Sequence, residues 1–364
     1  MSRLADWLVG QAPRWLRGEH GPLAPRQRRA LLAIQRCRTP ELGGRVYACT
    51  DCGKHDFAYH SCHHRACPRC GGGDTAEWTR KQTERLLPVP YFFWTFTVPE
   101  ALRGAFLAEP RLLHDLLFEA AALALQAVAG VGRHLGGELG ILAVLHTWGR
   151  QLQHHPHLHL IVPGGGLRPD GKHWQPCRHP EWFLPVQAVA AAFRRAFDEA
   201  LRAGAPHLHA QVPDPVWTAD WNVDVQPAGT GSAVLRYLAR YVKRTAISDE
   251  RILEINDREV TFAYTESDTG RRRECTLTAE EFMRRYLRHV PGAGEHRVRY
   301  FGWMHPSAKA RRMKVETLLA VPIVVRSRDP LPPPWHLRCP HCEAFSLVCV
   351  GNLPRGPPQA LRVA

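Results

Sequence analysis

The stretch that decides the fold is a pair of apolar segments, Ile141-Leu-Ala-Val-Leu-His-Thr-Trp148 and His157-Leu-His-Leu-Ile-Val-Pro163, separated by a short polar segment. Both segments are rich in β-branched and aliphatic residues, which predicts the two strands of a hairpin. Alternate residues of a strand share one face, so the imidazoles of His157 and His159 point the same way while the leucine between them packs into the core. If the chain reverses between the two strands, His146 lies close to this pair.

These histidines are candidate ligands of a catalytic divalent metal ion. Two adjacent imidazoles on a rigid strand leave coordination positions open for a substrate. We therefore predict His157 and His159 as ligands, with His146 as the candidate for the third. The ordinary alternative is a pair of surface histidines, with His146 hydrogen-bonded to a loop.

A second motif is Val234-Leu-Arg-Tyr-Leu-Ala-Arg-Tyr-Val-Lys-Arg244, whose apolar residues recur at helical spacing. Tyr237 and Tyr241 are four residues apart, so they share one face of the helix. A phenol that attacks a phosphodiester forms a covalent phosphotyrosine, which stores the bond energy for rejoining. The pKa of a phenol is about 10, so the attack needs a metal that polarises the phosphate. The ordinary alternative is that both rings are core residues of an amphipathic helix.

The charge of the chain points to nucleic acid as a partner. The 364 residues carry a formal net charge of +14 at pH 7, and a charge of this sign and size favours phosphate-rich partners. Mg²⁺ or Mn²⁺ is the expected catalytic metal, because such a site must also accommodate phosphate oxygens. The side chains that we expect to contact DNA are Arg65, Arg69, Arg236, Arg240, Lys243 and Arg244.

The cysteines near the N-terminus indicate a structural zinc site. Cys49-Thr-Asp-Cys52 is followed by Cys67-Pro-Arg-Cys70, and two such knuckles can place four thiolates tetrahedrally around one Zn²⁺. Four thiolates leave no open position, so this zinc stabilises the fold and does not catalyse. Further candidates in the same stretch could complete a second site: Cys37, His55, His60, Cys62, His63 and His64.

A third Cys-x-x-Cys pair, Cys339-Pro-His-Cys342, stands far along the chain. Taken alone it is half of a metal site, which His336 or Cys349 could extend. We predict no metal there. The clustered thiols as a whole indicate a reducing compartment, so a cytoplasmic, nucleoid-associated location is expected.

The remaining pattern predicts an α+β fold. An aromatic strand is expected over 91–98, paired strands over 251–266, and helices over 25–36, 112–130, 185–204 and 231–246. The apolar run 112–131 contains charged residues, so we interpret it as a buried helix and expect no membrane span. Three regions follow: a zinc-binding, DNA-contacting region 1–85, a central domain 86–300, and a basic, proline-rich tail 301–364.

One stretch imitates a nucleotide-binding loop. Gly166-Leu-Arg-Pro-Asp-Gly-Lys172 matches most of a phosphate-binding loop, but His173 stands where Ser or Thr would bind magnesium. Proline, aspartate and glycine in sequence also form a ready turn between strands. We therefore interpret the stretch as a hairpin and expect no nucleotide cofactor.

The motifs together resemble a known family, the two-tyrosine transposases of the insertion-sequence ninety-one family, which are HUH nucleases. The resemblance covers nearly the whole chain in order and spacing. It includes Cys67-Pro-Arg-Cys70, the strand end Phe96-Thr-Val-Pro99, His146-Thr-Trp-Gly149, His155-Pro-His-Leu-His159, the two-tyrosine helix and Arg299-Tyr-Phe-Gly302. One position departs from the family pattern, because Ala66 stands where a histidine is usual and leaves an extra zinc ligand there in doubt.

The resemblance implies a small N-terminal zinc-binding domain followed by an HUH-nuclease-like domain with a central antiparallel sheet flanked by helices. It implies rolling-circle transposition, in which one tyrosine nicks a DNA strand, forms a 5′-phosphotyrosine and leaves a 3′-OH. The family's histidine pair corresponds to His157 and His159, and its tyrosines to Tyr237 and Tyr241. The DNA is expected to be single-stranded or a hairpin end of a mobile element.

Two other functions stay open on sequence alone. A plasmid or phage replication initiator or relaxase would use the same chemistry on a different DNA. A non-catalytic zinc protein that binds DNA would need neither the histidines nor the tyrosines. The sequence does not determine the target site, the oligomeric state or which tyrosine attacks first.

Overall fold

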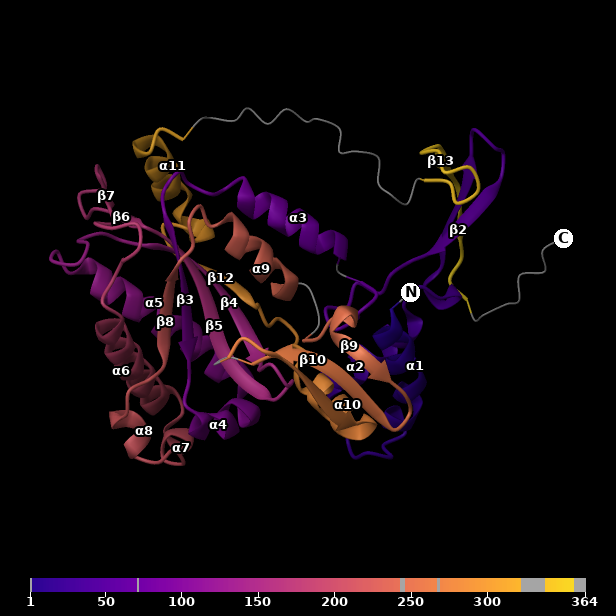
Figure 1. Cartoon of the computed structure of the whole chain (residues 1–364), viewed down its shortest axis with the longest axis horizontal. Helices are drawn as coiled ribbons and strands as arrows, with labels where there is room; N and C mark the ends of the chain where they lie inside the picture. Colours follow the sequence, from indigo (N-terminus) through magenta and orange to yellow (C-terminus); the bar gives the residue numbers. More distant parts are fainter. Residues whose placement is uncertain (1, 71, 243–245, 267–268, 322–337, 357–364) are drawn as a thin grey trace.

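The computed structural model describes residues 2–70, 72–242, 246–266, 269–321 and 338–356, except for the side chains at 72–74, 240 and 241. It has the mixed α+β architecture that the sequence predicts, with a central antiparallel sheet flanked by helices (Figure 1). The predicted elements form close to their expected bounds, because each combines a clear hydrophobic period with turn or helix-starting residues.

The central sheet has five strands in the order β12-β4-β5-β3-β8. Every neighbouring pair is antiparallel. The strand bounds are β3 Tyr91–Thr97, β4 Gly140–Trp148, β5 His154–Pro163, β8 Val223–Pro227 and β12 Val298–Gly302. The hairpin of β4 and β5 lies in the middle, with His146 directly opposite His157.

One face of the sheet is covered by two long helices, α5 Pro110–Gly130 and α6 Val186–Gly204. Their apolar sides pack on Leu158 and Leu160 of β5, with Phe193 and Phe197 of α6 in the same core. By length and composition α5 is apolar enough to cross a membrane, but 61% of its most apolar window is buried inside the protein. That burial accords with the core helix predicted for this stretch.

The other face is covered by α9 Ser232–Val242. Leu235, Leu238 and Val242 of this helix share a core with Val144 of β4 and Ile161 of β5. Helix α3 Gly72–Thr83 packs along α9. The histidines alternate with the leucines of β5, so they lie on this face, beneath α9.

A second body combines the N-terminal helices with a later part of the central domain. Helices α1 Arg3–Leu16 and α2 Pro25–Arg36 share a core with α10 Ala279–Arg288 and with the sheet β11-β10-β9. The strands are β9 Ile252–Ile255, β10 Glu259–Thr265 and β11 Arg272–Thr278. Phe282 of α10 packs edge-on against Trp7 of α1. The N-terminal region therefore depends on residues far along the chain for its core.

The C-terminal region is more structured than a tail. Helix α11 Lys309–Leu318 follows the central sheet, and β13 Leu347–Leu353 pairs with β1 Gly44–Cys49, which pairs in turn with β2 His55–Tyr59. Figure 1 shows this small sheet, with β13 and β2 on either side of β1, away from the central sheet. The prediction of a tail over 301–364 is wrong for these two segments, because their partners lie in distant parts of the sequence.

Short elements connect these bodies. The predicted hairpin after the histidine strand is present as β6 Gly165–Leu167 and β7 Trp174–Pro176, with Gly171 at φ 61° in its turn. The short helices are α4 Arg103–Ala108, α7 Pro206–His209 and α8 Pro215–Thr218, and the 3₁₀ turns are η1 Pro40–Leu42, η2 Glu100–Leu102, η3 Asp249–Arg251 and η4 Pro306–Ala308.

Candidate active site

Three histidines converge on the face of the central sheet beneath α9. The ring nitrogens of His146, His157 and His159 that could bind a metal lie within 4.8 Å of one another. The ring centroids are 4.5 Å apart for His146 and His159, and 4.8 Å apart for His157 and His159. The hairpin register thus brings all three sequence-predicted ligands to one point.

The surroundings keep these imidazoles neutral. Burial lowers the pKa of His157 to about 4. Burial, together with the neighbouring imidazoles, lowers the pKa of His146 and of His159 well below the usual value for histidine. A metal binds the lone pair of a neutral imidazole, so this cluster has the protonation state that metal binding requires.

Two hydrogen bonds fix the orientation of the histidine pair. His157 Nδ1 lies 2.7 Å from the carbonyl oxygen of His155, which can only accept, so Nδ1 donates and Nε2 carries the lone pair. His159 Nδ1 lies 3.2 Å from Thr95 Oγ1 on β3. Partners of this kind hold ligand rings in place at metal sites.

Aromatic rings stack on two of the three imidazoles. Phe93 of β3 stacks on His159 with 4.9 Å between centroids, and Trp148 stacks on His146 at 5.1 Å. The guanidinium of the buried Arg297 lies over the Trp148 ring, 5.3 Å from its centroid. Phe93, Thr95 and Arg297 were not among the site residues predicted from the sequence. The alternation of β3 was the available signal, because Phe93 and Thr95 pair with Ile161 and His159 of β5.

Tyr237 lies directly beside the histidines. Its ring centroid is 6.2 Å from that of His159 and 6.1 Å from that of Phe93. The side chain remains 41% exposed, so it is accessible from solvent. Leu235 and Leu238 of the same helix are buried against the sheet, and this packing fixes the position of α9.

The other predicted residues of this helix are described in part. The backbone of Tyr241 and Arg240 belongs to α9, one turn beyond the first tyrosine, but their side chains lie outside the described residues. Lys243 and Arg244 lie outside the described residues altogether. Arg236 is exposed, as a DNA-contacting side chain must be.

The two arginines predicted to contact DNA from the zinc region are engaged within the protein. Arg65 donates to the carbonyl oxygen of Glu295 at 2.7 Å. Arg69 donates to the carbonyl oxygen of Cys37 at 3.1 Å and pairs with Asp6. These contacts join the zinc region to the second body, and a DNA contact for either arginine stays a prediction.

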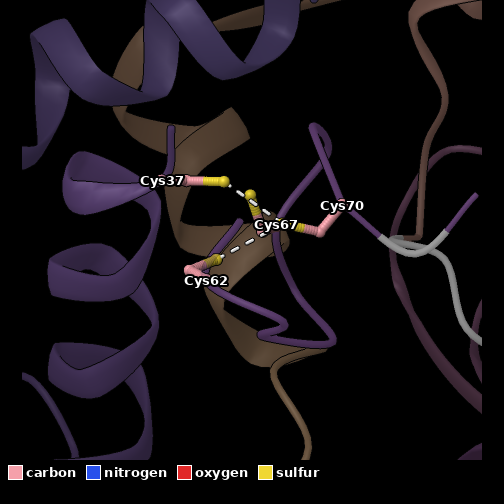
Figure 2. Close-up of side chains that lie close together, drawn as sticks. All are labelled: Cys37, Cys62, Cys67 and Cys70. Carbon is pink, nitrogen blue, oxygen red and sulfur yellow. Dashed lines mark hydrogen bonds between the residues drawn. The ribbon is translucent and has the colours of Figure 1, made fainter. Parts of the chain in front are cut away.

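The cysteines form two clusters, and neither has the predicted membership. Figure 2 shows the sulfurs of the first cluster, Cys37, Cys62, Cys67 and Cys70, turned toward one another. Cys70 Sγ lies 3.2 Å from Cys37 Sγ and 3.5 Å from Cys62 Sγ. A disulfide would need about 2.05 Å, whereas thiolates around one zinc at about 2.3 Å stand about 3.8 Å apart.

The prediction of one site from Cys49, Cys52, Cys67 and Cys70 is therefore wrong. Cys49 and Cys52 lie at the tip of the β1–β2 hairpin, while Cys62 follows the base of that hairpin. A strand of six residues spans about 20 Å, so the two knuckles cannot share an ion. Among the described residues, Cys49 and Cys52 group instead with Cys339 and Cys342. The prediction that this last pair is an isolated half-site is also wrong.

Comparison with known proteins identifies relatives over almost the whole chain. Residues 140–312 match a family described as a putative transposase, and residues 11–98 match a transposase zinc-binding domain. The chain is 36% identical to the putative transposase y4qJ of Sinorhizobium fredii (strain NBRC 101917 / NGR234), over 92% of this chain and 91% of that protein. It is 29% identical to the transposase for insertion sequence element IS801 of Pseudomonas savastanoi pv. phaseolicola, over 90% of this chain and 81% of that protein. No solved structure matches.

Proposed function

The chain belongs to the IS91 family of transposases, and from this premise we propose that it nicks and rejoins single DNA strands through a covalent 5′-phosphotyrosine. As a transposase it is an enzyme that binds DNA, and it carries a zinc-binding domain at its N-terminal end. The observation that carries the proposal is the ring of Tyr237 beside the cluster of His146, His157 and His159.

The nucleophile of the first step is the hydroxyl of Tyr237. Its oxygen attacks the phosphorus of a phosphodiester and forms the Tyr–O–P bond, while the bond from phosphorus to the 3′-oxygen breaks. The phenol loses its proton to solvent and the leaving 3′-oxygen takes one up, so the step yields a 5′-phosphotyrosine and a free 3′-OH. Reversal by a 3′-OH rejoins a strand without any external energy source.

The three imidazoles supply the binding site for a catalytic divalent ion. When bound, such an ion acts as a Lewis acid on the phosphate oxygen and stabilises the charge of the transition state. Within the described residues the cluster contains no carboxylate, and nitrogen ligands suit Mn²⁺ better than Mg²⁺, which prefers oxygen. We therefore favour Mn²⁺ of the two ions that the sequence suggests.

Tyr241 serves strand transfer in this proposal. It lies one helical turn from Tyr237 along α9, a rise of about 6 Å. Two nucleophiles on one helix allow a second strand to be attacked while the first is still attached. A replication initiator that nicks and reseals one strand would need a single tyrosine, and this difference favours transposition.

The proposal is tested by the polarity of the linkage. Purified protein is mixed with single-stranded oligonucleotides from the regions flanking its gene, labelled at either end, in the presence of Mn²⁺. We expect the 3′-labelled fragment to become protein-linked and the 5′-labelled fragment to be released with a 3′-OH that a polymerase extends. Cleavage without any linked fragment, or linkage to the 5′-labelled fragment, would contradict the mechanism.

DNA binding is expected to depend steeply on salt. The basic side chains that give the net charge of +14 are expected to neutralise phosphates of the DNA. The counterions of those phosphates are then released, which makes the affinity depend on salt. A protein contacting several phosphates loses affinity by on the order of 10³-fold between about 50 mM and about 200 mM salt. Fluorescence anisotropy with single-stranded or hairpin DNA measures this slope, with duplex DNA of the same sequence as the control. An affinity that stays constant over this range would exclude phosphate contacts as the main source of binding.

The expected compartment follows from the cysteines. Two clusters of free thiols need a reducing environment to bind zinc. We propose that the protein acts in the cytoplasm, associated with the nucleoid, where its DNA substrate lies.

A further inference from the structure

A second group of four cysteines joins distant parts of the chain. Cys49 and Cys52 come from the tip of the β1–β2 hairpin, and Cys339 and Cys342 come from the C-terminal segment. Cys49 Sγ lies 3.5 Å from Cys342 Sγ, and Cys52 Sγ lies 3.7 Å from Cys339 Sγ. These separations are too long for disulfides. They match the spacing of about 3.8 Å between thiolates that surround one Zn²⁺ at about 2.3 Å.

The two Cys-x-x-Cys turns have the same backbone conformation, although their sequences differ. In the first, the amide of Gly53 donates to the carbonyl oxygen of Cys49 at 3.0 Å. In the second, the amide of Glu343 donates to the carbonyl oxygen of Cys339 at 2.9 Å. Each first cysteine also donates its own amide to the carbonyl oxygen five residues later, at 2.9 Å and 2.7 Å respectively.

A backbone amide approaches the sulfur of the first cysteine in each turn. The amide of Cys52 lies 3.4 Å from Cys49 Sγ, and the amide of His341 lies 3.4 Å from Cys339 Sγ. An amide placed in this way can donate to the sulfur of a metal-bound thiolate. Thiolate is the form of cysteine that binds a metal.

The residue after each second cysteine is left-handed. Gly53 has φ 69°, which glycine adopts freely, and Glu343 has φ 62°, which is unfavourable for a residue with a side chain. Such a conformation persists only where the surroundings impose it. A metal ion bound by both turns accounts for this shared conformation, because it requires each turn to present its sulfurs in the same way.

The sheet around this cluster has only a small hydrophobic core to stabilise it. Strands β13, β1 and β2 form a three-stranded sheet whose buried core contains only four residues among those described: Tyr47, Cys49, Cys339 and Leu347. A core this small rarely stabilises a folded unit without disulfides or a metal. Among the described residues all cysteines are free thiols.

We propose that Cys49, Cys52, Cys339 and Cys342 bind a second structural zinc ion, which fastens the C-terminal segment 338–356 to the β1–β2 hairpin. The zinc-binding domain matched among known proteins covers residues 11–98 and so contains only half of these ligands. Four thiolates close the coordination sphere, so the ion holds structure and performs no chemistry. The inference does not depend on the strand-transfer mechanism.

The first test counts zinc in full-length protein by elemental analysis. We expect two zinc ions per chain in the wild type, one for each cysteine cluster, and one in the variant carrying Cys339→Ser and Cys342→Ser. The matched control is Cys349→Ser, because Cys349 lies on β13 in the same sheet but outside the cluster. It should retain both ions. A wild type with one ion, or a double variant that retains both, would overturn the proposal.

A second test uses the wild type alone, so it holds even if the double variant does not fold. Cys342 and Cys349 are both exposed, and they differ in whether they belong to the cluster. Brief alkylation of the zinc-loaded protein, followed by peptide mapping, should modify Cys349 at least ten times faster than Cys342. Removal of zinc with a chelator should abolish this difference. Equal rates at the two thiols before chelation would overturn the proposal.

Discussion

Replacing His157 and His159 together with alanine is expected to abolish DNA cleavage while leaving DNA binding within about twofold of the wild type. The ligand nitrogens of these imidazoles lie within 4.8 Å of that of His146, and together they would hold the proposed catalytic ion. A bound ion would stabilise the transition state by several kcal/mol, so cleavage should fall by about 10³-fold or more without it. DNA binding depends on basic side chains spread over the surface, and the two substitutions leave these side chains unchanged.

Two measurements separate loss of the metal from loss of the fold. Calorimetric titration with Mn²⁺ should lose its binding signal in the double variant, while zinc content and the thermal midpoint of unfolding remain close to those of the wild type. The matched control is His173→Ala, a histidine on the β6–β7 hairpin that is exposed and outside the cluster. Undiminished nicking by the double alanine variant would remove the histidine cluster from the mechanism.

The second large effect is expected at the tyrosines. The double substitution of Tyr237→Phe and Tyr241→Phe should abolish the covalent protein–DNA adduct, a loss of more than about 10³-fold, because no hydroxyl remains to attack the phosphate. Phenylalanine keeps the ring of residue 237 and its packing against Phe93 and His159. The variant should therefore fold normally, and its defect reports the hydroxyl alone.

The single substitutions divide the two roles. Tyr237→Phe removes the hydroxyl of the ring that lies beside His159 and should strongly reduce nicking. Tyr241→Phe should nick but fail in strand transfer, so complete transposition should be lost in either variant. Tyr264→Phe serves as the matched control, because Tyr264 belongs to β10 in a separate sheet. An adduct that survives in the double variant would leave α9 with a structural role only.

The sequence predicts the histidine cluster because the cluster depends on local geometry. The two-residue period of a strand places His157 and His159 on one face, and a short hairpin must bring the preceding strand alongside. His146 then follows from the register, and the structure places it directly opposite His157. The i, i+4 spacing of the tyrosines is equally local, but it does not say which face of the sheet α9 covers.

Which cysteines share a site could not be predicted from the sequence, because the grouping depends on the tertiary fold. Two Cys-x-x-Cys pairs close in sequence are the simplest combination, so the sequence predicts that Cys49 and Cys52 share a site with Cys67 and Cys70. In the structure the β1–β2 hairpin separates those knuckles, and strand pairing between β1 and β13 brings Cys339 and Cys342 to the hairpin tip. No periodicity in the sequence specifies a strand pair separated by about three hundred residues.

The most direct test of the central claim is to locate the covalent bond. Wild-type protein is incubated with Mn²⁺ and single-stranded DNA from the regions flanking its gene, denatured, digested with nuclease and protease, and mapped by mass spectrometry. We predict a nucleotide remnant linked through its 5′-phosphate to Tyr237 or Tyr241 in the peptide from α9. Cleaved DNA with no remnant on the protein, or a remnant on any residue outside α9, would contradict the account.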